Sequence, residues 1–401
     1  MTVDASDLPF PRPRVVVQHG GDLHRAIAQY GRPRADWLDL STGVNPEAYP
    51  VSMPTSDIWR TLPDDDDDLA AVAGVYYHWP ASHVLPVAGS QAVIRTLPAV
   101  LDGMTRAGKT DTPTSAGRGD AAVATLTYGE YAPAFAAAGV RVHTYDPADP
   151  APLDTLPDTV RYLVVVNPNN PTTDRHPVAT LREWQARLAR RGGALIVDEA
   201  FADAYDADAD GDAGAGTSDI GWTDIDIDAM ALPDSSLIVL RSVGKFFGLA
   251  GIRAGFVLAS PAICEALRVH LGAWTVSGPA RHAAREALRD TAWQTAMRRS
   301  LNAQRRALHA ILVEHGFPAR STPLFAWWPW ADAFGLQARL AEQGIWIRCF
   351  AASAAPSPAR PSATAFFETA RLPSVRIGLP GSTAALERLS RALSTIGASA
   401  R

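Results

Sequence analysis

Three short polar motifs follow apolar, strand-like runs, and their residue types are ones that do chemistry. The runs and their motifs are "RYLVVV" (161–166) with "NPNNPT" (167–172), "ALIVD" (194–198) with "DEAF" (198–201), and "SLIVL" (236–240) with "RSVGK" (241–245). The carboxyl ends of parallel strands meet at one edge of a sheet, which is where ligands bind. We therefore expect one crevice holding a carboxamide, a carboxylate, a hydroxyl, an amine and a guanidinium, from Asn170, Asp198, Ser242, Lys245 and Arg253.

The amine and the carboxylate suit pyridoxal phosphate. A lysine amine forms a Schiff base with the cofactor aldehyde, which is the role predicted for Lys245. A buried carboxylate keeps the pyridine nitrogen protonated, because an adjacent negative charge favours the cationic form; this is the role predicted for Asp198. A lone D-E-A or S-x-x-K is a weak signal, but all three motifs in this order at strand ends favour a catalytic site.

The cofactor phosphate needs hydrogen-bond donors, and two parts of the sequence supply them. One part surrounds the lysine, where an arginine adds a charge-assisted fork. The other is "VAGSQAVIRTL", in which a strand meets the start of a helix. We expect Tyr128 or Tyr131 of "TYGEY" to stack on the ring. The candidate phosphate ligands are Ser90, Gln91, Ser242 and Arg253.

The predicted elements place these groups at the edge of a doubly wound α/β sheet. Continuous apolar runs, including "GFVLA" (255–259), indicate strands covered on both faces, and helical stretches between them suggest a mostly parallel sheet. Residues 262–315 are helical in pattern and end at Gly316 as a C-cap. We expect an N-terminal arm that joins the small domain and the substrate site (1–50), a large cofactor-binding domain (51–265) and a smaller α+β domain (266–401).

Composition excludes several classes of protein. The 401 residues are 47% hydrophobic, and a net charge of -5 gives no reason to expect nucleic acid or an anionic membrane as partner. Two cysteines argue against a disulfide scaffold, and no apolar run is long enough to span a membrane, so we expect a cytoplasmic protein. The D-x-D-x-D-G motif at 206–211 resembles the start of a calcium loop, but Thr217 replaces the required Glu. A solvated acidic insertion (206–228) without metal is the better interpretation.

In these motifs and their order, the chain resembles fold-type I, aspartate-aminotransferase-like pyridoxal-phosphate enzymes over nearly its whole length. The resemblance implies that Lys245 bonds the cofactor, Asp198 pairs with the pyridinium and Asn170 donates to the ring 3-oxygen. Arg376, in "SVRIGLPG", matches the arginine that binds the substrate α-carboxylate. The resemblance also implies a homodimer.

Two groups within that superfamily are similar to the chain: histidinol-phosphate aminotransferases and the threonine-phosphate decarboxylases of cobalamin biosynthesis. The start "HGGDLHRAIAQYG" followed by "WLDLSTGVNP" resembles the decarboxylases, in which the histidine and the glycines after it help to bind the substrate phosphate. The arginine of "GIWIRCF" matches a second phosphate ligand. The candidate substrate-binding residues are His19, Gly20, Gly43, Asn170, Arg348 and Arg376.

Phe201 also favours the decarboxylases. Aminotransferases have D-E-A-Y, whose hydroxyl bonds the ring 3-oxygen, whereas the phenyl ring of Phe201 cannot donate. The expected reaction is decarboxylation of L-threonine O-3-phosphate to (R)-1-amino-2-propanol O-2-phosphate, and the alternative is a histidinol-phosphate-type aminotransferase. A third hypothesis is a non-catalytic scaffold in cobalamin assembly that uses the acidic 206–228 loop, and Lys245 argues against it.

The chain departs from the family pattern in three places. Related enzymes have R-Y-P, whose tyrosine reaches the cofactor phosphate of the neighbouring subunit, but "WRTLPDDDDDL" has Leu62 there. The usual glycine after Thr172 is missing, and the acidic insertion lengthens the interval between Asp198 and Lys245. We expect the acidic run 64–68 to be solvated and to cap the start of a helix.

Overall fold

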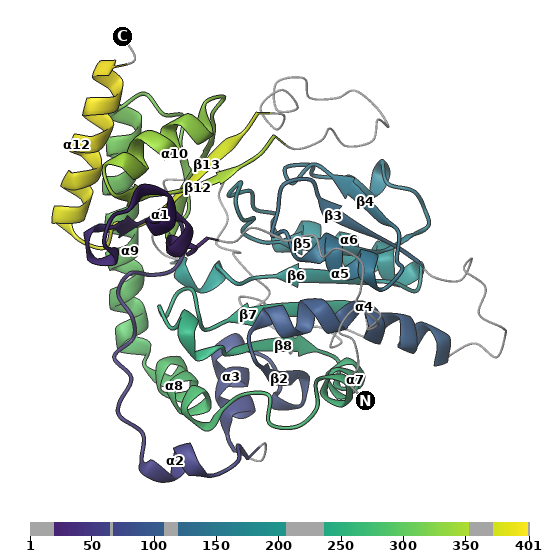
Figure 1. The fold of residues 1–401 in the computed structure, drawn as a ribbon. Helices are drawn as coiled ribbons and strands as arrows, with labels where there is room; N and C mark the ends of the chain where they lie inside the picture. Colours follow the sequence, from purple (N-terminus) through teal and green to yellow (C-terminus); the bar gives the residue numbers. More distant parts are fainter. Residues whose placement is uncertain (1–19, 65–66, 108–118, 206–235, 353–371, 400–401) are drawn as a thin grey trace, which may run out of the picture.

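The computed structural model describes residues 20–64, 67–107, 119–205, 236–352 and 372–399. Its central element is a seven-stranded sheet with the order β2-β8-β7-β6-β5-β3-β4 (Figure 1). The strands are β2 (Val84–Val87), β3 (Asp120–Ala124), β4 (Val142–Tyr145), β5 (Val160–Val166), β6 (Ala194–Asp198), β7 (Leu237–Ser242) and β8 (Gly255–Ala259). The neighbours from β7 to β4 pair in parallel.

Helices cover both faces of this sheet. One layer consists of α4 (Ser90–Ala107), α5 (Tyr131–Ala137) and α7 (Pro261–Leu271), and the other of α3 (Leu69–Tyr77), α6 (Val178–Arg190) and α8 (Gly278–Arg289). Successive residues of a strand pack into opposite layers: in β6, Ile196 joins the first core, whereas Leu195 and Val197 join the second. The continuous apolar runs therefore belong to strands buried on both faces, and the predicted mostly parallel α/β fold is confirmed.

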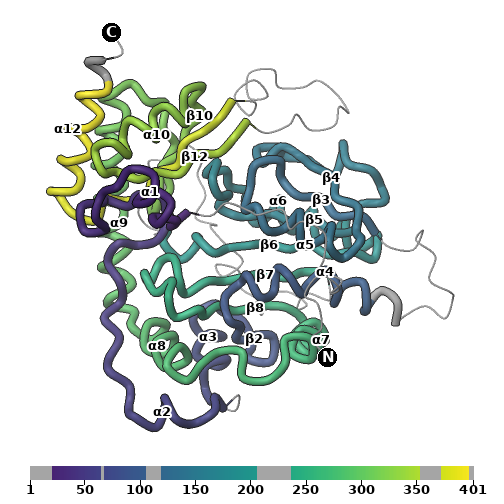
Figure 2. Tube along the Cα trace, in the orientation of Figure 1, coloured from purple at the N-terminus to yellow at the C-terminus, as the bar shows by residue number. Residues whose placement is uncertain are grey.

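A smaller antiparallel sheet has the order β12-β13-β10-β9 and packs against three helices. Its strands are β9 (Arg320–Ser321), β10 (Phe325–Pro329), β12 (Arg348–Phe350) and β13 (Ser374–Gly378), and the helices are α9 (Thr291–Glu314), α10 (Ala333–Glu342) and α12 (Thr383–Ser399). The N-terminal segment lies against this part of the molecule, because β1 (Leu38–Asp39) pairs in parallel with β11 (Ile345–Trp346). Figure 2 shows this segment running from α1 (Leu23–Tyr30) beside the small sheet to α2 (Ser56–Arg60) at the opposite end of the molecule.

Two details add to the sequence-based prediction. The strand β8 is antiparallel to both of its neighbours, so the sheet is mixed at this side. The segment 243–254, which carries the lysine motif and one short 3-10 helix (Ala250–Ile252), returns the chain from β7 to the neighbouring antiparallel strand β8 without a covering α-helix. Residues 262–315 form parts of three helices, α7, α8 and α9, and Gly316 adopts a left-handed conformation (φ 80°) just beyond the last of them.

The acidic run before α3 is not a purely solvated cap, in contrast to the prediction. The Asp67 carboxylate accepts a hydrogen bond from the backbone N–H of Leu69 at 3.0 Å, and it forms ion pairs with Arg281 and Arg285 of α8. These ion pairs and hydrogen bonds lower the pKa of Asp67 although burial opposes them. Part of the run therefore joins α3 to α8; residues 65–66 lie outside the described segments.

The helices α7 and α8 pack against the large sheet's layers, on α4 and on α3 respectively. We therefore propose that the second domain boundary lies near the start of α9, later than the predicted position 266. Within the described ranges, no helix is long and apolar enough to cross a membrane. The same ranges contain no group of three or more His, Cys, Asp or Glu side chains that could hold a metal ion.

Candidate active site

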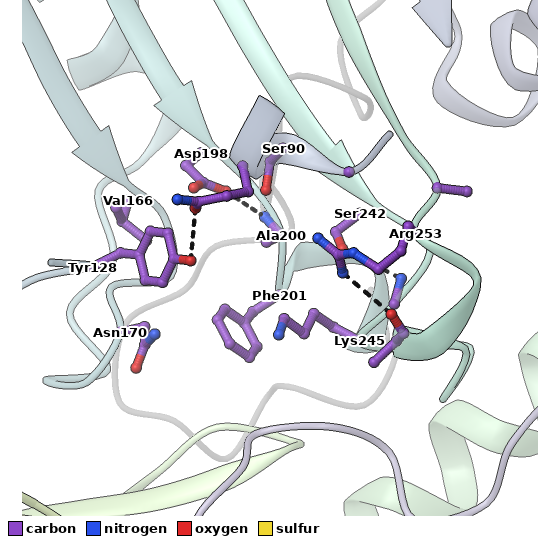
Figure 3. Close-up of a pocket in the computed structure, with 15 residues that line it drawn as sticks. Ser90, Tyr128, Val166, Asn170, Asp198, Ala200, Phe201, Ser242, Lys245 and Arg253 are labelled. Atoms are coloured by element: carbon purple, nitrogen blue, oxygen red, sulfur yellow. Dashed lines mark hydrogen bonds between the residues drawn. The ribbon is translucent and has the colours of Figure 1, made fainter. Parts of the chain in front are cut away.

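A pocket opens at the carboxyl ends of β5, β6 and β7, where the three motifs were expected to meet (Figure 3). Val166 is the last residue of β5, Asp198 is the last of β6, and Lys245 lies in the turn after β7; all three line the pocket. The structure thus brings all eight of the predicted cofactor-binding residues into one cavity. Its predicted members are Ser90, Gln91, Tyr128, Asn170, Asp198, Ser242, Lys245 and Arg253.

The Lys245 amine is held in an unusual electrostatic environment. Burial, together with the positive charges of Arg376 and Arg253, lowers the pKa of Lys245 to about 8, although Asp198 acts in the opposite direction. Among the described residues the amine makes no hydrogen bond or ion pair, and it lies 5.7 Å from the centre of the Phe201 ring. The backbone around it is fixed, because its carbonyl accepts a hydrogen bond from the Asn45 N–H at 3.0 Å. The lowered pKa increases the neutral fraction of the amine near neutral pH, and only the neutral amine attacks an aldehyde.

The Asp198 carboxylate is buried and fully oriented. Its side chain accepts a hydrogen bond from the Tyr131 hydroxyl at 2.8 Å on Oδ2 and one from the Ala200 N–H at 3.1 Å on Oδ1. Burial raises the pKa of Asp198, while these two hydrogen bonds and the charges of Lys245 and Arg241 act to lower it. A cationic group bound in the pocket would therefore strongly favour the ionised form of the Asp198 carboxyl group over the protonated form.

The two tyrosines left open by the sequence occupy different positions. Tyr128 lines the pocket, and its hydroxyl donates to Gln91 Oε1 at 2.9 Å. Tyr131 is fully buried behind it and contacts Asp198 instead. Tyr128 is therefore the one placed to stack on a ring in the pocket, and the hydrogen bond of Tyr131 to Asp198 was not foreseen from the sequence.

Donors suited to a phosphate group gather at one end of the pocket. Helix α4 begins at Ser90, so its first N–H groups face this end. Arg253 approaches from the turn before β8, and a Cβ at Gly89 would lie 2.9 Å from its Nη2; Gly89 also has a φ of 76°. Ser242 contributes its hydroxyl, which accepts the Gly244 N–H at 3.2 Å. The glycine before α4 thus allows the Arg253 guanidinium to lie close to the start of the helix.

Arg376 enters the site from β13 of the small sheet. It donates to Asn170 Oδ1 at 2.6 Å and to the Ser41 carbonyl at 2.6 Å. Burial and the charge of Arg348 lower the pKa of Arg376 to about 9, although Asp39 opposes this. Because the carbonyl oxygen of Asn170 is taken by Arg376, the amide NH₂ of Asn170 is left as a donor for the pocket.

Arg348 lies directly opposite Arg376, since the two residues pair across β12 and β13. Burial lowers the pKa of Arg348, and the charge of Arg25 on α1 lowers it further. Sequence reasoning missed Arg25, because a lone exposed arginine on a short helix carries no motif. Three guanidinium groups near one another favour a ligand with more than one negative charge.

The N-terminal segment borders the same region. A Cβ at Gly20 would lie 2.3 Å from the Ser41 carbonyl oxygen and 3.1 Å from Arg376 Nη2, so the chain passes very close to the arginine there. A Cβ at Gly43 would lie 3.0 Å from both the Phe201 and the Phe325 rings. The predicted residue His19 lies outside the described residues. Leu62, which replaces the expected tyrosine, is largely exposed.

A buried ionic cluster lies directly behind the pocket and was also missed by the sequence reasoning. Arg241, the residue before Ser242, forms ion pairs with Glu199 and Asp203, and all three side chains are almost completely buried. The guanidinium also lies 4.6 Å from the centre of the Tyr77 ring. Glu199 follows Asp198 in the chain, so the cluster ties the end of β6 to the end of β7.

The donor set fits pyridoxal phosphate. The pocket presents a lysine amine with a lowered pKa for an aldehyde, a buried carboxylate for a ring nitrogen, and a helix start with an arginine for a phosphate. A buried carboxylate and a buried amine are each costly without a partner, so a ligand that engages both would stabilise this arrangement.

Comparison with known proteins agrees with this fold and this donor set. Residues 68–386 match the family described as "Aminotransferase class I and II". The chain belongs to this family. Within it, the chain is 39% identical over 381 residues to a threonine-phosphate decarboxylase of Pseudomonas aeruginosa, covering 94% of this chain and 97% of that protein.

Two further comparisons show the range of the family. A histidinol-phosphate aminotransferase of Mycobacterium tuberculosis is 33% identical over 242 residues, which cover 57% of this chain and 58% of that protein. The crystal structure of histidinol-phosphate aminotransferase from Sinorhizobium meliloti in complex with pyridoxal-5'-phosphate superposes with a TM-score of 0.68, covering 99% of this chain and 97% of that chain. At 19% identity this last match shows the shared fold alone.

Proposed function

We propose that this protein is a pyridoxal-phosphate-dependent decarboxylase that converts L-threonine O-3-phosphate into (R)-1-amino-2-propanol O-2-phosphate and CO₂. The observation that carries the proposal is the 39% identity to a threonine-phosphate decarboxylase across 94% of the chain. The pocket supports it, because its charged groups match a cofactor with an aldehyde, a ring nitrogen and a phosphate.

In this proposal each side chain has a defined task. Bound pyridoxal phosphate supplies the electron sink that accepts the bonding pair left when CO₂ departs. Asp198 holds the proton on the ring nitrogen, which keeps that sink effective. Asn170 donates to the ring 3-oxygen and Tyr128 stacks on the ring, while Lys245 delivers a proton to Cα of the product.

The two facing arginines orient the substrate. Arg376 would bind the α-carboxylate and so orient the bond to the departing carbon. Arg348, with His19 and Gly20 of the N-terminal segment, binds the substrate phosphate, and Gly43 leaves room beside Phe201. A substrate that carries both a carboxylate and a phosphate satisfies both guanidinium groups, whose mutual repulsion otherwise costs free energy.

The alternative is a histidinol-phosphate-type aminotransferase. Histidinol phosphate carries a phosphate but no carboxylate, so as the amino donor it cannot place one anion on each of the two facing arginines, whereas threonine phosphate can. The absence of a hydroxyl at Phe201 also favours the decarboxylase, as does the lower coverage of the aminotransferase relative. We further propose that the enzyme acts in cobalamin biosynthesis, in the cytoplasm, as a homodimer.

An assay without an amino acceptor tests the proposal. Purified protein loaded with pyridoxal phosphate is incubated with L-threonine O-3-phosphate in the absence of any 2-oxoacid, and CO₂ and the amino-alcohol phosphate are measured. Stoichiometric release of both is expected. Activity that depends strictly on 2-oxoglutarate, with glutamate as product, would instead identify an aminotransferase.

A further inference from the structure

Tyr131 does not line the pocket, but its hydroxyl forms a hydrogen bond with Asp198, which does. It is the first residue of α5, its side chain is fully buried, and its hydroxyl donates to Asp198 Oδ2 at 2.8 Å. Its ring meets that of Tyr128 edge-on, with centroids 6.3 Å apart. Tyr131 therefore reaches no ligand directly, and its polar contact is with the carboxylate that faces the ligand.

We propose that Tyr131 is a positioning residue that keeps Asp198 ionised and correctly oriented toward the pyridine nitrogen. The inference rests on the proposed function, because the orientation of the carboxylate matters to catalysis only if a cationic ring lies against it. It also explains why two tyrosines, three positions apart, occur where one aromatic would be enough to stack on a ring.

The hydrogen bonds of Asp198 show how this works. Burial favours the protonated, neutral form of the carboxyl group, which could not hold a proton on the ring nitrogen. Tyr131 donates to one oxygen and the Ala200 N–H to the other, so both oxygens are fixed and the anion is favoured. The attraction of Lys245 depends on the protonation of its amine, whereas these two hydrogen bonds do not.

Tyr131 is suited to remain a donor. Burial and the charge of Asp198 raise the pKa of Tyr131 well above its usual value, so the phenol keeps its proton through the neutral and mildly alkaline range. The backbone N–H of Ala200 can be removed only by a proline, which would also restrain the main chain, but the Tyr131 hydroxyl can be removed while the ring stays in place. The contribution of this single hydrogen bond is therefore measurable.

Tyr131→Phe tests the proposal, with Tyr145→Phe as the matched control. Tyr145 at the end of β4 is also buried, and its hydroxyl donates to the Val164 carbonyl at 2.7 Å, away from the pocket. Each variant therefore loses one buried hydroxyl and one hydrogen bond. The readouts are the affinity for pyridoxal phosphate, the pH midpoint of the cofactor's absorbance change, and kcat/KM.

A pyridine ring without a proton on its nitrogen withdraws less electron density from the nitrogen that joins the cofactor to Lys245. That linking nitrogen should then hold its own proton to a higher pH. For Tyr131→Phe we therefore expect the pH midpoint of the cofactor's absorbance change to rise by about 0.5 unit or more. Its kcat/KM should fall about 10- to 100-fold, consistent with the loss of a hydrogen bond to a charged group. In Tyr145→Phe the midpoint should be unchanged and kcat/KM should stay within about twofold of the wild-type value.

The possible results separate the two proposals. A Tyr131→Phe protein with the wild-type midpoint and affinity would overturn the role of Tyr131 and leave the proposed function intact. An equal shift in Tyr145→Phe would also overturn it, because the effect would then follow from the loss of any buried hydroxyl. A wild-type protein that never shows the cofactor's absorbance would overturn the proposed function, and this inference with it.

Discussion

Arg348 and Arg376 face each other directly across the antiparallel strands β12 and β13. Because side chains opposite one another on neighbouring strands lie on the same face, two positive charges are brought together on one face of the small sheet. Their proximity contributes to the lowered pKa of Arg376. Two positive charges so close together repel each other, and under the proposed function a substrate that carries both a carboxylate and a phosphate would offset this repulsion.

Replacing Arg348 should therefore weaken recognition of the substrate phosphate selectively. For Arg348→Ala we expect KM for threonine phosphate to rise about 10- to 100-fold, because a charge-assisted hydrogen bond is lost. The preference for threonine phosphate over threonine should fall by a similar factor, as measured by kcat/KM for both compounds. Arg391→Ala, which removes an exposed arginine on α12, serves as the control. An unchanged preference in Arg348→Ala would contradict the assignment.

The lowered pKa of Lys245 predicts the pH dependence of cofactor capture. Only the neutral amine attacks an aldehyde, and with a pKa of about 8 its neutral fraction rises through pH 8. The rate at which cofactor-free protein takes up pyridoxal phosphate should therefore increase between about pH 7 and pH 9 and then level off. Stopped-flow absorbance would measure it. A rate still rising steeply near pH 10 would show an ordinary lysine.

Asp198→Ala should separate binding of the cofactor from its use. The phosphate ligands and Lys245 remain, so weak binding of pyridoxal phosphate should persist. Without the carboxylate the ring nitrogen loses its proton, and kcat should fall roughly 100-fold or more. Cofactor absorbance after dialysis and the acceptor-free CO₂ assay measure the two effects. Near-normal turnover in this variant is incompatible with the assigned role.

The buried ionic cluster predicts a large effect on stability. Arg241→Met leaves Glu199 and Asp203 without their cation in the core, which should lower the free energy of unfolding by about 3–5 kcal/mol. Arg268→Met removes an exposed pair with Glu265 and should cost about 1 kcal/mol or less. Chemical denaturation of both variants would measure this. Equal, small losses would mean that the cluster contributes little beyond an exposed ion pair.

The sequence predicted the parts of the site that depend on local order along the chain. The strand-like runs that end in Asp198 and in the lysine motif can be recognised, because a parallel strand buried on both faces is continuously apolar. The change from apolar to polar residues then marks where the strand ends. Arg253, eight positions after Lys245, lies in the same connection between β7 and β8. These residues meet because parallel strands bring their carboxyl ends to one edge.

Contacts between distant segments could not be predicted in this way. The hydrogen bond from Tyr131 to Asp198 joins residues 67 positions apart, and no sequence motif around either residue predicts that the two side chains meet. The approach of Arg25 to Arg348 depends on how α1 lies against the small sheet. The ion pairs of Asp67 with α8 likewise depend on helix packing, which an acidic run alone does not reveal.

The most direct test of the account uses the fact that the chain has only two lysines, Lys109 and Lys245. Protein incubated with pyridoxal phosphate is reduced with borohydride, digested, and mapped by mass spectrometry. We predict that the pyridoxyl label is found on the peptide containing Lys245 and that it disappears in Lys245→Ala. A label found at Lys109 alone, or no label on the Lys245 peptide, would contradict it.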